Sequence, residues 1–362
     1  MSDKIKVGVL GATGIVGQNY LSLLENHPWF QVTYLAASER SAGRSYAEAV
    51  KGRWHMKKEI PKGIENLIVG NANDVCQALD KCQFVFSALE MDKDAIKQLE
   101  LEYAKHIPVV SNNSAHRWTE DVPMLIPEIN SRHVDLIIKQ RENHNLNGFI
   151  VVKPNCTLQS YLLPIYALIK EDYKVKNIVV TTMQALSGAG YPGISSLDII
   201  DNVIPIHGEE EEKNENEPLK ILGLLDEKAG KIINCQTIKI SSSCNRVNVI
   251  DGHTASVSLE FTNKKPELEE IIRIWNDFKS IPQILELPSA PEHPILYREE
   301  ENRPQPKKDR DTENGMSIVV GRLRRCNVLD IKFTSLSHNL IRGAAGGGIL
   351  NAELLAIYGY IK

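Results

Sequence analysis

The chain has 362 residues with a formal net charge of −4, and 42% of its residues are hydrophobic and 24% charged. This length predicts two domains, and the charge gives no sign of the basic surface that binds nucleic acid. No apolar run approaches the ~20 residues that cross a bilayer, and the N-terminus lacks a signal peptide, so we expect a cytoplasmic protein without membrane contact. The six cysteines are scattered without a CxxC pair, which predicts neither a disulfide framework nor a metal site.

The first part of the chain alternates between strand and helix patterns. Residues 4–10 have an apolar strand pattern, a glycine-containing turn follows, and residues 15–27 carry apolar side chains at helical spacing. This alternation is typical of a Rossmann-type, doubly wound parallel sheet, which is an α/β fold. We expect this dinucleotide-binding domain to span residues 1–155. Its further strands are expected at residues 31–36, 84–88, 109–111 and 149–152.

A glycine turn joins the first strand to the first helix. Gly11, Gly14 and Gly17 allow a tight turn and let backbone N–H groups approach a pyrophosphate at the helix N-terminus. The spacing differs from GxGxxG, and a turn without a ligand is the alternative. In this strand–turn–helix context we expect cofactor contacts from Gly11, Thr13, Gly14, Ile15, Val16 and Gly17.

The end of the second strand bears on the choice between NAD and NADP. A NAD site usually places an acidic residue there, and Glu39 could take this role. Ser38, Arg40 and Ser41 could instead donate hydrogen bonds to a 2′-phosphate, and Arg40 adds a full positive charge. The arginine favours NADP as the cofactor, and a polar loop without a ligand is the alternative.

The region after residue 155 has longer and more β-branched strands. Helices are expected at residues 195–204 and 266–278, and an exposed, charged loop with two prolines at residues 299–313. These patterns predict a second, α+β domain over residues 156–339 with a mixed or antiparallel sheet. A glycine-opened helix at residues 343–360 follows, and we expect residues 340–362 to complete the first domain. The strands of the second domain are expected at residues 178–184, 237–241, 255–261, 316–323 and 330–336.

Cys156 follows the strand at residues 149–152 and precedes a helix that starts near Leu162. A thiol at a helix N-terminus has its thiolate stabilised by the helix dipole and by free N–H groups, so we expect a lowered pKa and a reactive sulfur. An inert buried thiol is the alternative. Cys244 is a rival nucleophile, but it lies inside an apparent strand.

Arg246 and His253 are seven residues apart and can face the same side if a strand and a turn connect them. The ordinary pKa of histidine lies near working pH and suits proton transfer, and an arginine suits a carboxylate. Taken singly, a turn histidine and a solvated arginine are the simpler interpretations.

Several sequence strings, taken together and in this order, carry a more specific signal than any one of them. The chain resembles aspartate-semialdehyde dehydrogenase from Lys4 to its C-terminus, and most closely the archaeal and fungal branch of that family. The strings that carry the resemblance are GATGIVG, KPNCT, QALSGAGYPG, GEEEEK, CNRVNVIDGH and HNLIRGAAGGGILNAELL.

The resemblance implies a role for each matching residue. Cys156 would be the nucleophile, His253 the general acid/base, and Gln184 would orient the acyl intermediate. Arg246 would hold the substrate carboxylate and Glu210 its ammonium. The remaining implied contacts are Lys213 and Arg117 with the phosphate, Asn155 with the substrate, and Ser187, Gly188 and Asn339 with the cofactor.

The family chemistry would be NADPH-dependent reduction of L-4-aspartyl phosphate to L-aspartate 4-semialdehyde and phosphate through a Cys156 thioester, in lysine, threonine and methionine biosynthesis. The family also implies a homodimer or homotetramer. One alternative is a malonyl-CoA or succinyl-CoA reductase of the same fold, against which the intact Pro154–Asn155 pair argues. Another is a non-catalytic NADP-binding regulatory protein, against which the complete set of Cys156, Gln184, Arg246 and His253 argues.

Overall fold

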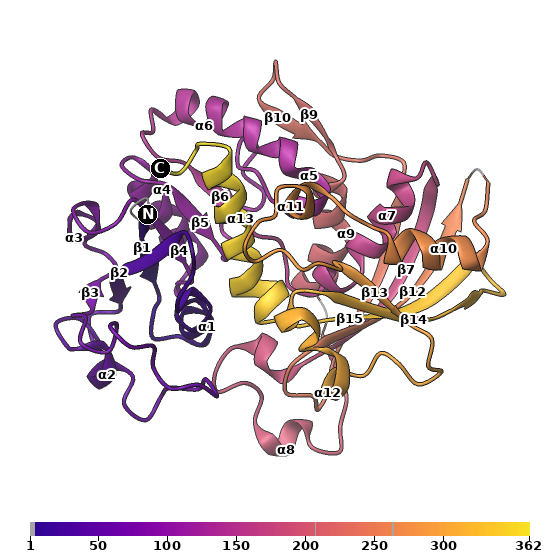
Figure 1. The fold of residues 1–362 in the computed structure, drawn as a ribbon, viewed down its shortest axis with the longest axis horizontal. Helices are drawn as coiled ribbons and strands as arrows, with labels where there is room; N and C mark the ends of the chain where they lie inside the picture. Colours follow the sequence, from indigo (N-terminus) through magenta and orange to yellow (C-terminus); the bar gives the residue numbers. More distant parts are fainter. Residues whose placement is uncertain (1–3, 207, 263) are drawn as a thin grey trace.

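A computed structural model describes residues 4–206, 208–262 and 264–362. The chain forms two lobes, each built around its own large sheet (Figure 1). Among the described residues, no helix is long and apolar enough to span a membrane.

The first sheet has six strands in the order β3-β2-β1-β4-β5-β6, and every pair is parallel. Its strands are nearly fully buried apolar runs, because helices cover both faces of a parallel sheet. Helices α1 (Ile15–Leu24) and α4 (Lys93–Ala104) contribute to the cores on opposite faces. The strand bounds are β1 Ile5–Leu10, β2 Phe30–Ala37, β3 Gly70–Asn71, β4 Phe84–Ser87, β5 Val109–Ser111 and β6 Ile150–Val152. The shorter helices of this lobe are α2 Tyr46–Ala49, α3 Cys76–Leu79, α5 Pro127–Asn130 and α6 Leu136–His144.

The second sheet has seven strands in the order β13-β14-β15-β12-β7-β11-β8 and is mixed, as expected, because β7–β11 and β13–β14 are parallel pairs. The strand bounds are β7 Val175–Gln184, β8 Ile204–Ile206, β11 Lys239–Arg246, β12 His253–Phe261, β13 Ile295–Arg298, β14 Ile318–Arg325 and β15 Ile331–Ser337.

Two helices, α7 (Leu162–Lys170) and α10 (Leu268–Asn276), pack on one face of this sheet, where Trp275 is fully buried. The alternating side chains of β7 that face the other way, including Val179 and Thr181, are exposed. Helix α9 (Glu209–Ile221) packs against β11. The remaining elements are the hairpin β9 (Leu224–Asp226) and β10 (Lys231–Ile233) and the short helices α8 Ser196–Ile199, α11 Ile281–Ile284 and α12 Pro306–Asp309.

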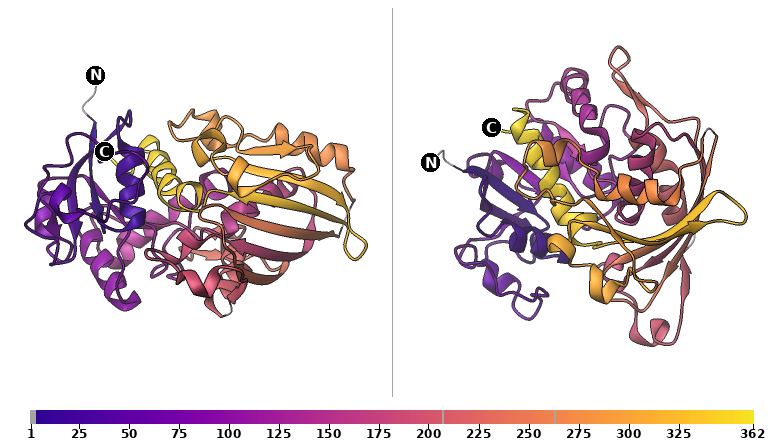
Figure 2. Two further views of the ribbon diagram at one scale, coloured as in Figure 1. Left: turned by 90° about the horizontal axis from the view of Figure 1, so that it is seen from below. Right: turned by 45° about the vertical axis from the view of Figure 1, so that its right-hand side comes forward.

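The C-terminal helix α13 (Gly346–Ile357) lies between the two lobes in each view (Figures 1 and 2). Its Leu350 and Leu354 are buried in the core that also holds Tyr20 of α1 and strands of the first sheet. At Gly348 a Cβ would lie 2.0 Å from the Tyr20 hydroxyl, so glycine allows this close contact between the helices.

Three expected segments differ from the structure. Only Ser196–Ile199 is helical within residues 195–204, because Asp201 adopts a left-handed φ of 59° and Leu197, 91% exposed, has no core to pack against. The segment 299–313 is not simply an exposed loop. It carries α12, and Asp309 is buried beside Arg303, whose guanidinium hydrogen-bonds both carboxylate oxygens. Helix α1 also ends earlier than expected, before Asn26 with its φ of 60°.

Candidate active site

Cys156 lies just beyond β6, in a turn that faces the start of β12. Its Sγ is 3.3 Å from Nε2 of His253, the first residue of β12. The backbone N–H of Ala185 donates to Nδ1 of His253 at 3.0 Å. The neutral ring therefore carries its proton on Nε2, and that N–H points at the sulfur.

Burial lowers the pKa of His253 to about 3, with Arg246 and His338 adding to the shift. A protonated ring would also set an Nδ1–H against the N–H of Ala185. The resting arrangement thus suits His253 as a hydrogen-bond donor to sulfur or to an oxyanion. It does not suit removal of a proton from the thiol, which is the other half of the general acid/base role expected from the sequence.

The expected lowering of the Cys156 pKa is wrong for this arrangement. Burial raises the pKa of the thiol, and the Glu210 carboxylate raises it further, against the opposing charges of Lys153, Arg117 and Arg246. The regular helix α7 begins at Leu162, where the sequence placed it, after a 3₁₀ turn at Leu158–Ser160. Its N-terminus is six residues beyond Cys156, and the effect of a helix dipole falls off within the first turn, so it does not lower the pKa of this thiol. Cys244, the rival nucleophile, is buried within β11 as expected.

A cavity of about 250 Å³ opens beside Cys156. It brings together two cations, a carboxylate and the sulfur from segments far apart in the sequence. The residues expected at the site that line it are Val16, Arg117, Asn155, Cys156, Gly188, Glu210, Lys213 and Asn339.

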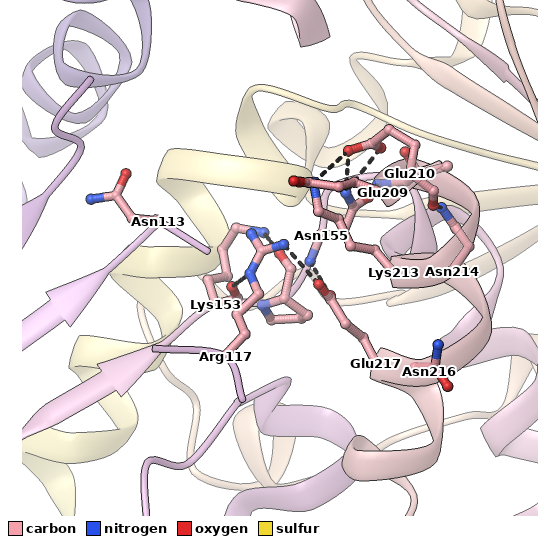
Figure 3. A network of polar contacts seen from close by, with 12 residues as sticks. Asn113, Arg117, Lys153, Asn155, Glu209, Glu210, Lys213, Asn214, Asn216 and Glu217 are labelled. Carbon is pink, nitrogen blue, oxygen red and sulfur yellow. Dashed lines mark hydrogen bonds and ion pairs between the residues drawn. The ribbon is translucent and has the colours of Figure 1, made fainter. Parts of the chain in front are cut away.

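The four consecutive glutamates at the start of helix α9 point in different directions, because successive side chains project from different sides of a helix. Glu210 accepts hydrogen bonds from the side-chain amide of Asn155 at 3.1 Å and from Lys213 at 3.0 Å (Figure 3). Glu209 is exposed and pairs with Lys93, whereas Glu211 accepts from the backbone N–H of Cys244. Glu210 is therefore the one of the four that lines the cavity.

Gln184 and Arg246 end neighbouring strands, β7 and β11, and both are buried outside the lining of this cavity. Arg246 donates from Nη1 to the carbonyl of Ala185 at 2.7 Å. A Cβ on Gly188 would lie 2.9 Å from both Arg246 Nη1 and His253 Cε1, so a larger residue at this position would collide with both side chains.

A separate crevice of about 590 Å³ runs along the carboxyl edge of the first sheet. Gly11, Thr13, Gly14, Ile15, Ser38 and Arg40 line it. Gly17 does not, but its Cβ would lie 2.2 Å from the carbonyl oxygen of Gly11, so its role is close packing of helix against strand. Ser41 is buried and its N–H bonds to the Ser38 carbonyl, so it is not placed to donate into the crevice as expected.

Ser187 and Asn339 connect two loops beside the sulfur site. Asn339 Nδ2 donates to Ser187 Oγ at 2.8 Å, and Asn339 Oδ1 accepts from the backbone N–H of Gly252 at 2.8 Å. Ser187 lines a neighbouring cavity with His338 and Asp251, not the one that contains Cys156.

Three residues at these sites were missed by sequence reasoning. Arg53 lines the cofactor crevice together with Arg40. Glu217, fully buried, and Lys153, 1% exposed, contact the turn that carries Cys156. Burial lowers the pKa of Lys153 to about 7, with Arg117 and Arg342 lowering it and Cys156 and Glu217 raising it. The only sequence signal for Lys153 was its position three residues before the cysteine.

Comparisons with known proteins identify the family of the chain. Residues 6–137 match the family model described as "Semialdehyde dehydrogenase, NAD binding domain", and residues 165–342 match "Semialdehyde dehydrogenase, dimerisation domain". The chain is 46% identical to the aspartate-semialdehyde dehydrogenase of Archaeoglobus fulgidus, over 97% of this chain and 98% of that protein. It is 42% identical to the enzyme of Aspergillus fumigatus, over 99% of both chains.

The chain is also similar to a solved structure of the family and to an enzyme with a different substrate. The crystal structure of aspartate-semialdehyde dehydrogenase with NADP from Candida albicans has a TM-score of 0.90 and 35% identity, over 99% of this chain and 100% of that one. The malonyl CoA reductase (NADP) of Metallosphaera sedula is 39% identical over 100% of this chain and 99% of its own length. The chain belongs to the aspartate-semialdehyde dehydrogenase family.

Proposed function

We propose that the protein reduces L-4-aspartyl phosphate to L-aspartate 4-semialdehyde and phosphate with NADPH, and runs the reverse reaction when phosphate and the semialdehyde are supplied. The observation that carries this proposal is the single cavity that joins the Cys156 sulfur to the Arg117 and Lys213 cations and the Glu210 carboxylate. An acyl phosphate with an ammonium group matches this set of charges. The pathway we propose is lysine, threonine and methionine biosynthesis.

In the first step, the Cys156 thiol gives up its proton to solvent, and the thiolate attacks the acyl carbon as the C–O bond to phosphate breaks. Arg117 and Lys213 stabilise the charge of the departing phosphate, and Glu210 holds the substrate ammonium. The product of this half-reaction is a thioester on Cys156, which accepts hydride more readily than a carboxylate would. Arg246 is proposed to hold the α-carboxylate and Gln184 to orient the acyl group.

Binding of the substrate ammonium to Glu210 also has an electrostatic consequence for the nucleophile. In the resting site the Glu210 carboxylate raises the pKa of Cys156. An ammonium against that carboxylate would offset its charge and favour the thiolate. The substrate would thus help to activate the sulfur that attacks it.

The residues of the crevice fit NADP. The positive φ of Gly11 and the close approach of Gly17 to Gly11 shape a turn that brings the N-terminus of α1 to the crevice, where a pyrophosphate would bind. Arg40 and Arg53 would supply charge for a 2′-phosphate. Val16, Gly188 and Asn339 would lie at its nicotinamide end. NADPH, when bound, supplies the hydride that reduces the thioester.

His253 acts on the oxyanions of both halves of the reaction. Its Nε2–H, fixed by the Ala185 hydrogen bond, donates toward the sulfur and the neighbouring oxyanion. As the hemithioacetal oxyanion collapses, the C–S bond breaks and the sulfur leaves as a thiolate. Because the thiolate is regenerated, the whole cycle takes up one proton from solvent, and this proton binds to the phosphate released in the first half.

The experiment that tests this function is a steady-state assay with NADP, phosphate and aspartate semialdehyde. We expect Cys156→Ser to abolish turnover while NADP still binds, and Cys244→Ser, at a buried thiol within β11, to retain turnover. Full activity of Cys156→Ser would reject the assignment.

The 39% identical malonyl CoA reductase makes a CoA thioester the second candidate substrate. Malonate semialdehyde has no ammonium group to match Glu210, so we expect turnover of aspartate semialdehyde and not of malonate semialdehyde. Faster oxidation of malonate semialdehyde than of aspartate semialdehyde would instead favour the CoA thioester as the substrate.

We further propose that residues 1–155 form the dinucleotide-binding domain, completed by residues 340–362, and that residues 156–339 form the catalytic and dimerisation domain. The exposed face of the second sheet, with Val179 47% exposed, supports a homodimer or homotetramer. We propose the cytoplasm as the compartment, because six free cysteines and a thiol nucleophile suit a reducing environment. Sedimentation measurements would determine the number of subunits.

A further inference from the structure

Glu217 lies two helical turns after Glu210 on α9, with its side chain directed to the same turn of the chain (Figure 3). It is fully buried. Its two carboxylate oxygens have different partners: Oε1 accepts from Arg117 Nη1 at 2.8 Å, and Oε2 accepts from the backbone N–H of Asn155 at 2.6 Å. One side chain therefore connects a cation of the cavity to the residue before Cys156.

Charged side chains bind the backbone of this turn at three successive polar groups. The carbonyl of Lys153 accepts from Arg117 Nε at 3.1 Å, and the carbonyl of Pro154 accepts from Lys153 Nζ at 3.0 Å. The N–H of Asn155 donates to Glu217. Pro154 has no N–H of its own, so Arg117, Lys153 and Glu217 satisfy every backbone polar group from the carbonyl of residue 153 to the N–H of residue 155.

The two ends of the Asn155 side chain complete the arrangement. Asn155 Oδ1 accepts from the N–H of Thr157 at 2.7 Å, and its amide donates to Glu210. The position of Cys156 is thus fixed from both neighbours in the chain. The hydrogen bonds on one side lead through Glu217 to Arg117, and those on the other lead to Glu210.

We propose that Glu217 is a positioning residue for the reaction, which sets the orientation of the Arg117 guanidinium and the place of the Cys156 turn together. Through it, the cation that receives the phosphate group and the sulfur that attacks the acyl carbon keep a fixed separation. The inference rests on the proposed function, because it assigns phosphate binding to Arg117.

Only a carboxylate can hold both partners of Glu217, because both partners donate hydrogen bonds. A carboxylate accepts at both oxygens, whereas a glutamine of the same shape accepts at one atom and donates at the other. In Glu217→Gln, either Arg117 or the N–H of Asn155 would face an N–H donor. The isosteric change should therefore release one of the two partners without creating a cavity. Because both partners are held by this one side chain, the release of either should displace Arg117 relative to the Cys156 turn.

The test compares Glu217→Gln with Glu215→Gln in the phosphate-dependent oxidation of aspartate semialdehyde. Glu215 lies on the same helix and also accepts a backbone N–H, but that of Ser242, whereas the partners of Glu217 are Arg117 and Asn155. We expect Glu217→Gln to raise the KM for phosphate at least tenfold, with the KM for aspartate semialdehyde changed less than twofold. Glu215→Gln should change neither constant more than twofold.

A phosphate KM within twofold of the parent enzyme, or an equal rise in both KM values, would overturn the proposal. Inactive parent enzyme would instead reject the proposed function itself. NADP binding and a cooperative thermal transition establish that the variant is folded.

If Glu217→Gln does not fold, Glu217→Asp gives the same comparison. The shorter side chain retains the charge but cannot reach both partners at their present distances. The same selective rise in the phosphate KM supports the proposal, and its absence overturns it.

Discussion

Cys156 and His253 are 97 positions apart in the sequence, yet Sγ of one lies 3.3 Å from Nε2 of the other. A hydrogen bond from the backbone of Ala185 sets which nitrogen of the imidazole carries the proton. The pair is therefore arranged for donation toward sulfur, and this arrangement has consequences for how activity depends on pH.

His253 should stay neutral throughout the range in which the enzyme works. Its pKa is lowered to about 3 by burial and by Arg246 and His338, so no proton should bind to it between pH 5 and pH 9. We expect its Cε1–H resonance to keep a constant chemical shift across this range. In the unfolded chain its pKa returns to about 6.5, so this group makes folding less favourable as pH falls below that value. A titration of the His253 resonance near pH 6.5 would contradict the proposed tautomer.

Glu210→Gln should make the Cys156 thiol easier to ionise in the free enzyme. The Glu210 carboxylate raises the thiol pKa, and removing its charge lowers that pKa. The pH midpoint for alkylation of Cys156 by iodoacetamide should therefore move to lower pH. Glu212→Gln, at an exposed position of the same helix, should leave the midpoint in place. An upward shift in Glu210→Gln is the contrary outcome.

Gly17→Ala should mainly reduce the stability of the fold, whereas Gly14→Ala should mainly weaken cofactor binding. At Gly17 a Cβ would lie 2.2 Å from a backbone oxygen, whereas at Gly14 the nearest atom would be 3.5 Å away. We expect Gly17→Ala to lower the free energy of unfolding by about 1–3 kcal/mol, the usual cost of overpacking. Gly14→Ala should melt near the parent temperature but bind NADP more weakly, because it lines the crevice. Thermal melts and calorimetric titration measure the two effects, and equal melting temperatures would refute the packing role of Gly17.

Arg40→Ala should weaken NADP binding about tenfold and leave NAD binding nearly unchanged, since a charge-assisted hydrogen bond contributes about 1.5–3 kcal/mol and solvent screening reduces it. Arg44→Ala is the control, because Arg44 is exposed nearby and does not line the crevice. Fluorescence titration with both cofactors gives the dissociation constants for NADP and NAD, and hence the change in affinity for each. Equal loss for NAD and NADP would place the arginine away from the 2′-phosphate.

The sequence predicted most strands of both sheets, because buried apolar runs and β-branched segments carry their own signal. It missed the short strands β3, β8 and β13, and it ended β11 at residue 241, five residues before its observed end. Strand β5 has the expected bounds, and β12 and β15 differ by at most two residues at either end. Segment 299–313 was harder, because a buried ion pair such as Arg303–Asp309 leaves no trace in the hydrophobic pattern.

Site residues behaved differently from strands. Glu217 belongs to a run of charged and polar residues that is typical of a solvated helix, and only the packing of α9 against the Cys156 turn buries it. The Cys156 pKa was misjudged for a related reason. The local context showed a helix ahead, but the pKa of the thiol is raised first by burial in the folded structure and then by the charge of Glu210, 54 positions away.

The packing of α13 under the first sheet means that the nucleotide-binding half is assembled from both ends of the polypeptide. During synthesis on the ribosome, strands β1 to β6 keep part of one apolar face, the part that α1 does not cover, exposed until the last residues emerge. A stop codon shortly before residue 346 would leave every side chain of the Cys156 turn in the product, but it would leave the cofactor half without a closed interior.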